Sequence, residues 1–175
     1  MTEGRELSPS ETHLVSCEIW IDREGDWYHR GARMERADIV AHLCQHLGRD
    51  ESSGRYVIRM GKEECYVEVE DTPLVISRVI SAAGEEGGDD TGFLVVIKHL
   101  DRTERLDPGS LRVGRDNVLY CTVKPGRLPA RFLRPAYYQL AEFIREDPER
   151  GGFYLPVAGR RHYIGGAGPW HECTD

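Results

Sequence analysis

The strongest constraint on the fold is a repeated order of predicted elements along this 175-residue chain. Each copy has a hairpin or strand, an arginine that begins an amphipathic helix, a strand after Gly-x-Tyr, and a glycine turn. With a shift of 98 residues, identical residues align: Arg36 with Arg134, Gly54 with Gly152, Tyr56 with Tyr154, and Gly61 with Gly159. Upstream, with six extra residues in the second copy, Tyr28 aligns with Tyr120. Because each copy supplies one helix to cover one antiparallel sheet, the repeat predicts an α+β fold made by internal duplication.

Hydrophobic periodicity and turn residues set the predicted boundaries. Apolar residues at i, i+3, i+4 and i+7 predict one amphipathic helix over 36–47 and a second that begins at Arg134. The run Glu-Glu-Gly-Gly-Asp-Asp at 85–90 cannot pack in a core, so it is predicted to join the two halves. The expected segments are a flexible tail at 1–14, a first lobe at 15–83, an acidic linker at 84–92, a second lobe at 93–165 and a tail at 166–175.

The composition restricts the partners that we expect. With 39% hydrophobic and 30% charged residues the chain is predicted to be globular, and its net charge of -7 leaves no basic stripe for nucleic acid. No stretch approaches the roughly 20 apolar residues that cross a bilayer, and no membrane partner is expected. These features favour a cytoplasmic protein.

The cysteines are predicted to be unpaired. They are odd in number, widely spaced and without a C-x-x-C pair: Cys17, Cys44, Cys65, Cys121 and Cys173. The first four lie in predicted strands or a helix, where a free thiol usually behaves as a small buried hydrophobe. A reducing compartment fits this pattern.

Three stretches carry a resemblance to a known family. They are Arg-Glu-Gly-Asp-Trp-Tyr-His-Arg-Gly at 23–31 leading to Arg36, Val-Glu-Asp-Thr-Pro at 69–73, and Ala-Arg-Phe-Leu-Arg-Pro-Ala-Tyr-Tyr at 130–138. In this order and at these separations they resemble the domain-of-unknown-function family 1285, an uncharacterised bacterial family. The resemblance implies a duplicated α+β fold whose second half is superficially like a pleckstrin-homology domain. It also implies a groove between the halves for a small ligand, with nucleotide-based compounds as candidates, in signal transduction.

Arginines at the two predicted helix starts are candidate ligand-binding residues. Arg36 and Arg134 each place a cation near the positive end of a helix dipole, so a compensating negative charge is expected. An internal carboxylate such as Asp71 could supply it, and so could a bound anion held by guanidinium and helix N–H groups. The internal salt bridge is the favoured alternative.

Aromatic residues and a histidine complete the predicted groove. Trp27 and His29 alternate with Tyr28 on a short strand and should face one side, and Tyr137 lies on the buried stripe of the second helix. For Trp27 the alternative is core packing, whereas His29 lies at a strand exit, where sites often form. The predicted ligand-binding set is Trp27, His29, Arg36, Asp71, Arg134 and Tyr137.

Catalytic patterns are weak in this sequence. His42 and His46 have the i, i+4 spacing that can chelate zinc, but the glutamate of the zincin motif is replaced by Leu43. Glu68 and Glu70 share the solvent face of a predicted strand, and glycine-rich segments do not sit between a strand and a helix as phosphate loops do. No catalytic residue, metal ligand or cofactor is assigned, and an enzyme is the least favoured class.

The leading hypothesis is a non-enzymatic protein that binds a small anionic ligand between two similar lobes in a regulatory role. The alternative is a protein interaction module without a small ligand, which would use exposed strand edges or the acidic surface.

Overall fold

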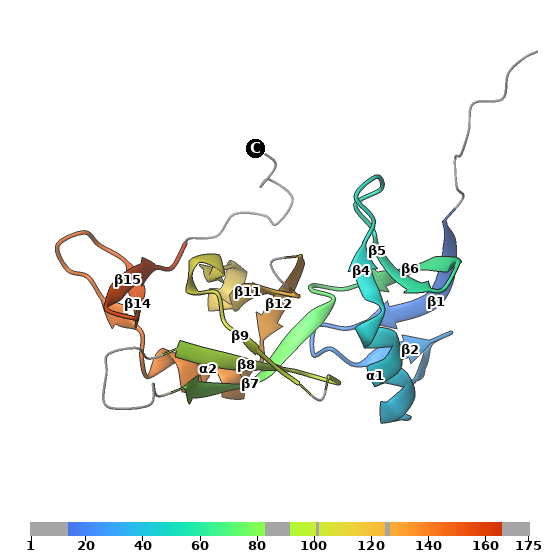
Figure 1. The fold of residues 1–175 in the computed structure, drawn as a ribbon, viewed down its shortest axis with the longest axis horizontal. Coiled ribbons are helices and arrows are strands. Elements are labelled where there is room, and N and C mark those ends of the chain that lie inside the picture. The colour runs from blue at the N-terminus through green and yellow to red at the C-terminus, as the bar shows by residue number, and fades with distance from the viewer. Residues whose placement is uncertain (1–13, 83–91, 101, 125–126, 166–175) are drawn as a thin grey trace, which may run out of the picture.

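The computed structural model describes residues 14–82, 92–100, 102–124 and 127–165. Figure 1 shows two lobes, with the first sheet and α1 at one end of the molecule and the second sheet, α2, β14 and β15 at the other. The first sheet has the order β3-β2-β1-β6-β5-β4. Its elements are β1 (Val15–Ile21), β2 (Trp27–His29), β3 (Ala32–Arg33), α1 (Ala37–Gln45), β4 (Leu47–Arg49), β5 (Tyr56–Met60) and β6 (Glu63–Val69).

The second lobe contains a six-stranded and a three-stranded sheet. The larger sheet has the order β10-β11-β12-β7-β8-β9, and the smaller one the order β13-β14-β15. The elements are β7 (Leu74–Ala82), β8 (Gly92–Ile97), β9 (Thr103–Arg105), η1 (Pro108–Ser110), β10 (Arg112–Val113), η2 (Arg115–Asn117), β11 (Leu119–Val123), β12 (Leu128–Phe132), α2 (Arg134–Ala141), β13 (Arg145–Glu146), β14 (Phe153–Val157) and β15 (Arg160–Tyr163). The predicted α+β class is confirmed.

Both helices are shorter than the apolar spacing predicts. The helix expected over 36–47 ends at Gln45, because Leu47 is 4% exposed and pairs with Ile58 in the sheet instead of continuing the helical stripe. Val40 and Cys44 form its buried face. A short strand therefore follows each helix directly, β4 after α1 and β13 after α2.

Strand pairing confirms that the two lobes are similar. The order β1-β2-β3-α1-β4-β5-β6 recurs as β10-β11-β12-α2-β13-β14-β15. The antiparallel pair Trp20 with Tyr28 matches Arg112 with Tyr120. The parallel pair Trp20 with Glu68 matches the single parallel bridge between Arg112 and Gly165. Residue numbers rise by 92 from Trp20 to Arg112 and from Tyr28 to Tyr120, and by 97 from Glu68 to Gly165. The central parallel contact is therefore repeated as well.

The shift after the helix start is 97 residues rather than the predicted 98. Arg36 is the N-cap of α1 and Leu133 is the N-cap of α2, and in each helix the first turn closes on that residue. Arg36 and Arg134 are therefore not structurally equivalent. The identical residues that align at a shift of 98 therefore led to a predicted shift that is one residue too large.

Sheet membership changes earlier in the chain than the predicted lobe boundary. The predicted first lobe runs to residue 83, but β7 pairs with β8 and, in parallel, with β12 of the second sheet. The three strands β7, β8 and β9 are inserted between the two repeats. The change of sheet lies at 70–73, and the acidic run at 85–90 falls outside the described residues. The likeness of the second half to pleckstrin-homology domains stays a prediction.

The prediction of four unpaired cysteines is wrong for two of them. Cys17 on β1 and Cys65 on β6 form a disulfide, with their Cα atoms 5.2 Å apart. β1 and β6 are parallel neighbours at the centre of the first sheet, so residues 48 apart in sequence meet across one strand pair. Cys44 and Cys121 are free and buried, and burial raises the pKa of the Cys44 thiol to about 11. Cys173 lies outside the described residues.

Side chains of the second lobe bind backbone groups of the first. Lys98 Nζ donates to Glu24 O at 2.9 Å and to Asp26 Oδ1 at 2.7 Å, while His99 Nε2 donates to Gly25 O at 2.8 Å. Lys124 Nζ donates to carbonyls at the C-terminal end of α1, at 2.8 Å from Cys44 O in the last turn and 2.9 Å from Leu47 O just after it. A cation there complements the negative end of the helix dipole. These bonds dock the two lobes on each other.

The His99 contact predicts a pH dependence of stability. Burial lowers the pKa of His99 from its ordinary value of 6.5, because removal from water disfavours the charged ring more than the hydrogen bond to Gly25 O favours it. The unfolded chain binds the proton more readily, so this contribution is complete above about pH 6.5 and is lost as the pH falls through the folded pKa. We expect the melting temperature to fall less between pH 7.5 and pH 5.0 in His99→Gln than in the wild type. Equal falls in both proteins would contradict this role.

Candidate functional site

The carboxylate of Asp71 lies in the segment that joins β6 to β7 and accepts hydrogen bonds from two side chains of the second lobe. Arg131 Nη1 donates to Asp71 Oδ2 at 2.8 Å, and the Tyr120 hydroxyl donates to the same oxygen at 3.0 Å. Neighbouring Thr72 accepts from Arg131 N at 3.1 Å and donates to Leu74 O at 2.7 Å. The side chains of Asp71 and Arg131 are 24% and 23% exposed, so this pair is partly shielded from water.

The fold brings these groups together for a simple reason. β12 runs parallel to β7 with Arg131 opposite Val75, and the hydrogen bond from Arg131 N to Thr72 Oγ1 ties this residue to the segment that precedes β7. Tyr120 is paired with Arg131 across β11 and β12. Burial, reinforced by the charge of Asp71, raises the pKa of Tyr120 to about 12. The phenol is therefore a hydrogen-bond donor at neutral pH.

A shallow hollow lies on the first lobe beside this cluster. It has a volume of about 200 Å³ and is lined by Arg55, Tyr56, Tyr66, Val67, Glu68 and Val69. The guanidinium of Arg55 stacks over the Tyr66 ring at 4.3 Å. Tyr56 pairs with Arg49 across β4 and β5. The pKa of Tyr56 is raised, chiefly by burial, and the negative charge of Asp71 also raises it. We call Arg49, Arg55, Tyr56, Asp71, Tyr120 and Arg131 the junction cluster.

Solved structures with the same architecture exist. A DUF1285 family protein from Silicibacter pomeroyi superposes with a TM-score of 0.71 at 22% identity, covering 91% of this chain and 89% of that one. The chain has a DUF1285-like fold. A DUF1285 family protein from Shewanella baltica gives a TM-score of 0.59 at 21% identity and covers 71% of this chain and 90% of that one. Neither a protein-family model nor a curated protein matches the sequence.

Within the DUF1285-like fold, the predicted site residues do not converge on one groove. Asp71 lies at the junction, whereas Trp27 is 2% exposed in the hydrophobic core. His29 is exposed at the end of β2, opposite Ile19. Tyr137 is half-buried against the core, with its ring 5.5 Å from that of Tyr138. The predicted ligand-binding set as a whole stays a prediction.

The two helix-start arginines have separate surroundings. Arg36 pairs with Asp38 in the first turn of its own helix, and both side chains are exposed. Arg134 is an exposed residue at the first position of α2. The expected internal salt bridge of Asp71 exists, but its partner is Arg131. The sequence analysis did not single out Arg131, although this residue lies in the third stretch of the DUF1285 resemblance. Tyr120, another member of the junction cluster, was noted only because it aligns with Tyr28.

Neither a metal site nor a membrane-spanning helix is found in the part of the chain that the structure describes. The rings of His42 and His46 are 4.6 Å apart, and His46 Nδ1 donates to His42 O at 2.9 Å. No group of three or more His, Cys, Asp or Glu residues is placed to hold a metal among the residues that the structure describes. None of the helices in these residues is long and apolar enough to span a membrane.

Proposed function

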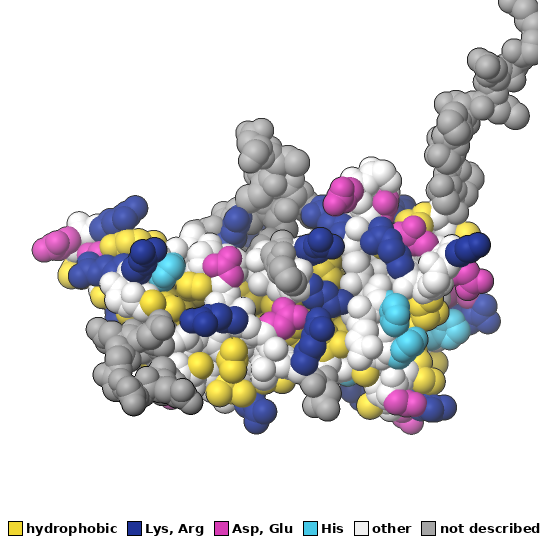
Figure 2. All heavy atoms as spheres, in the orientation of Figure 1, with side chains coloured by type: hydrophobic (Ala, Val, Ile, Leu, Met, Phe, Trp, Pro, Cys, Tyr) yellow, Lys and Arg dark blue, Asp and Glu magenta, His cyan; other side chains and the backbone are white. Residues whose placement is uncertain are grey.

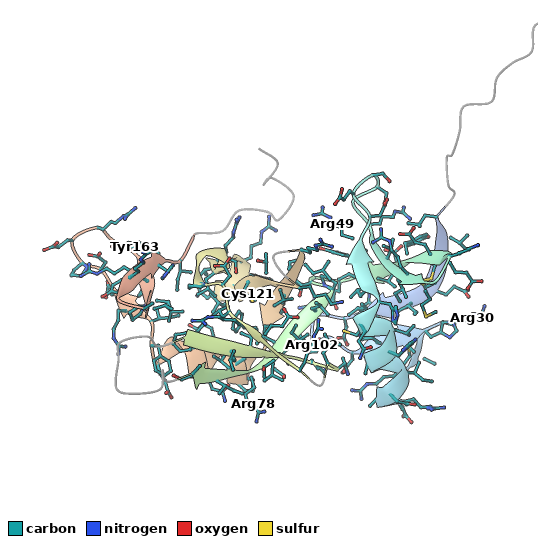
Figure 3. All side chains as sticks on the ribbon, viewed as in Figure 1. Arg30, Arg49, Arg78, Arg102, Cys121 and Tyr163 are labelled. Carbon is teal, nitrogen blue, oxygen red and sulfur yellow. A yellow bond between two sulfur atoms is a disulfide. The ribbon has the colours of Figure 1, made fainter. Side chains whose placement is uncertain are left out.

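We propose that this protein is a non-enzymatic binding protein that holds a small anionic ligand at the junction cluster, in a regulatory role. The observation that carries the proposal is the guanidinium of Arg55, stacked on Tyr66 in a hollow beside an acid that is already neutralised. Arg131 is bound to Asp71, whereas Arg55 lines the hollow together with Glu68, and Arg49 pairs with the lining residue Tyr56. Figure 2 shows Lys and Arg side chains gathered over the boundary between the lobes, and Figure 3 places Arg49 and Arg102 there.

The chemistry of the hollow favours an anion attached to a flat group. Guanidinium groups bind phosphate and carboxylate through paired N–H donors, and tyrosine rings stack on planar rings. A volume of about 200 Å³ accommodates one phosphate or one ring of a larger ligand rather than the whole of it. Nucleotides, which combine both features, are therefore the first compounds to test.

The experiment is a thermal-shift screen with AMP, GMP, pyrophosphate and inorganic phosphate. A ligand that binds only the folded protein raises its stability, by about 2.7 kcal/mol at a concentration of 100 times the Kd. We expect at least one compound to raise the melting temperature of the wild type and to bind about tenfold more weakly to Arg55→Gln, because one charge-assisted hydrogen bond is lost.

The control is Arg78→Gln, which removes another exposed arginine, on β7, that does not line the hollow. Its affinity should equal that of the wild type. Arg131 is unsuitable for the test, since its removal leaves Asp71 without its cation. Failure of all four compounds at millimolar concentration, or equal weakening in both variants, would exclude this site.

Protein binding is the second candidate function. Trp20 is 42% exposed on the outer face of the first sheet, and its ring lies 5.1 Å from that of Tyr28. Exposed tryptophan and tyrosine are common at the centres of protein interfaces. Absence of any anion-dependent stabilisation would make this face the leading candidate.

A further inference from the structure

A backbone hydrogen bond of the first repeat has no counterpart in the second, at a place where the second repeat has a hollow. In the first repeat Arg59 N donates to His46 O at 3.2 Å, which extends the pairing between β4 and β5 past Leu47. With the shift of 97 residues that relates these strands, the equivalent residues are Pro156 and Phe143. Proline has no N–H group, so the equivalent bond to Phe143 O cannot form.

The lost bond leaves the edge of β14 uncovered. β13 pairs with β14 only at Arg145 with Tyr154 and Glu146 with Phe153, whereas β4 covers three residues of β5. Beyond β13 lies a hollow of about 340 Å³, lined by Phe143, Tyr154, Pro156, Ala158, Gly159, Arg160 and Arg161. We call it the β14 hollow. Its volume lies within the range of small-ligand sites.

The wall of the β14 hollow is flat and largely carbon. The Phe143 ring packs edge-on against the buried Phe93 ring, with centroids 4.9 Å apart, which holds it in place. Tyr154 is half-buried, and its ring is 5.8 Å from that of Tyr163. Together with Pro156 these groups form a surface on which a planar ring can stack.

Cations form the rim of the β14 hollow. Arg161 stacks at 5.0 Å over the Tyr154 ring and donates to Asp147 Oδ2 at 3.1 Å, so its guanidinium is oriented. Asp147 is 5% exposed and also accepts from the Tyr163 hydroxyl at 2.6 Å. Arg160 is exposed and forms no ion pair with any residue that the structure describes. Figure 2 shows Lys and Arg side chains beside hydrophobic ones over β14 and β15, at the end of the molecule away from α1.

We infer that the β14 hollow binds a planar aromatic group that carries one phosphate or carboxylate. The ring stacks against Phe143, Tyr154 and Pro156, and the anionic group binds the guanidinium of Arg160 at the rim. The first repeat cannot form the same site, because Arg59 occupies the position of Pro156 and closes the strand pair. This site is separate from the junction cluster and stands without it.

The test uses phenyl phosphate, with phenol and inorganic phosphate as its two halves. Titrations followed by amide chemical shifts should show phenyl phosphate moving the signals of residues 158–161. Its affinity should exceed that of either half by about tenfold or more, because stacking and the charged hydrogen bond act together. Equal affinity for phenyl phosphate and inorganic phosphate would overturn the stacking surface, and shifts confined to residues away from the hollow would overturn the site.

Two variants locate the ligand. Arg160→Gln removes the rim cation at an exposed hairpin position and should weaken phenyl phosphate binding about tenfold without changing the melting temperature. Pro156→Arg installs the residue of the first repeat, restores the N–H donor and should abolish the shifts. Arg78→Gln and Arg55→Gln should leave binding unchanged, and the second of these separates this site from the junction cluster. Wild-type affinity in both Arg160→Gln and Pro156→Arg would overturn the inference.

Discussion

Replacing Cys17 and Cys65 together with serine is expected to lower the free energy of unfolding by about 3 kcal/mol. The disulfide closes a loop between residues 48 apart and ties β1 to β6 at the centre of the first sheet. A cross-link of this length restricts the unfolded chain strongly and leaves the folded chain almost unchanged. Equilibrium unfolding in urea, followed by circular dichroism, measures the difference directly.

Reducing agent supplies the control for the cysteine prediction. It should destabilise the wild type to the level of the double variant and have no effect on the variant itself, because the variant has no bond to reduce. Cys44→Ser is not a suitable control, since the Cys44 side chain is fully buried in the core. Identical unfolding midpoints for the wild type with and without reductant would refute the contribution of this bond.

Local patterns in the sequence were enough to predict one repeat unit. The strand expected after Gly-x-Tyr and the glycine turn at Gly61 correspond to β5 and the turn before β6, and the apolar spacing over 36–47 predicted α1, whose buried residues are Val40 and Cys44. Both patterns arise from contacts between residues close in sequence, so the residues themselves record them. The duplication followed, because the same local patterns occur twice.

Contacts between distant segments were not predictable in this way. β12 carries Pro129 in its interior, which argues against a strand, yet it pairs with β11 and β7. The disulfide partners lie in strands whose parallel pairing no local pattern specifies. Asp71 was predicted as a carboxylate that could compensate a helix-start arginine, but its partner is Arg131, which becomes its neighbour only through the pairing of β12 with β7. The site therefore depends on topology, and Asp71 is the member of the junction cluster that the predicted ligand-binding set contained.

The pseudo-symmetry of the repeats also explains where function can differ between them. Tyr66 and Tyr163 are equivalent residues, and each has an arginine stacked on its ring, Arg55 at 4.3 Å and Arg150 at 4.2 Å. The two arginines are not at equivalent positions, because the shift of 97 residues takes Arg55 to Gly152. Among the described residues, the first copy is closed by the disulfide and by the parallel pairing of β1 with β6, whereas the second has an isolated parallel bridge between Arg112 and Gly165. The second copy is thus the more open one, and it carries the larger hollow.

Gly25→Ala is expected to lower the free energy of unfolding by about 3 kcal/mol, since it combines backbone strain with overlap at the contact between the lobes. Gly25 has φ +77°, and a Cβ atom there would lie 2.5 Å from Val75 Cγ2. In the same turn, Gly25 O accepts a hydrogen bond from His99 and Glu24 O accepts one from Lys98. Displacement of the turn therefore weakens these contacts as well.

Gly31→Ala separates the two causes of this loss. Gly31 has φ +80°, nearly the same backbone conformation, but nothing lies within 4 Å of its added Cβ. That variant should therefore cost only the strain, about 1 kcal/mol. Val75→Ala in the Gly25→Ala background should recover part of the larger loss, because it removes the atoms that the new methyl group meets. If urea unfolding shows equal losses in Gly25→Ala and Gly31→Ala, backbone strain alone is responsible and the close approach of the lobes at Val75 contributes nothing.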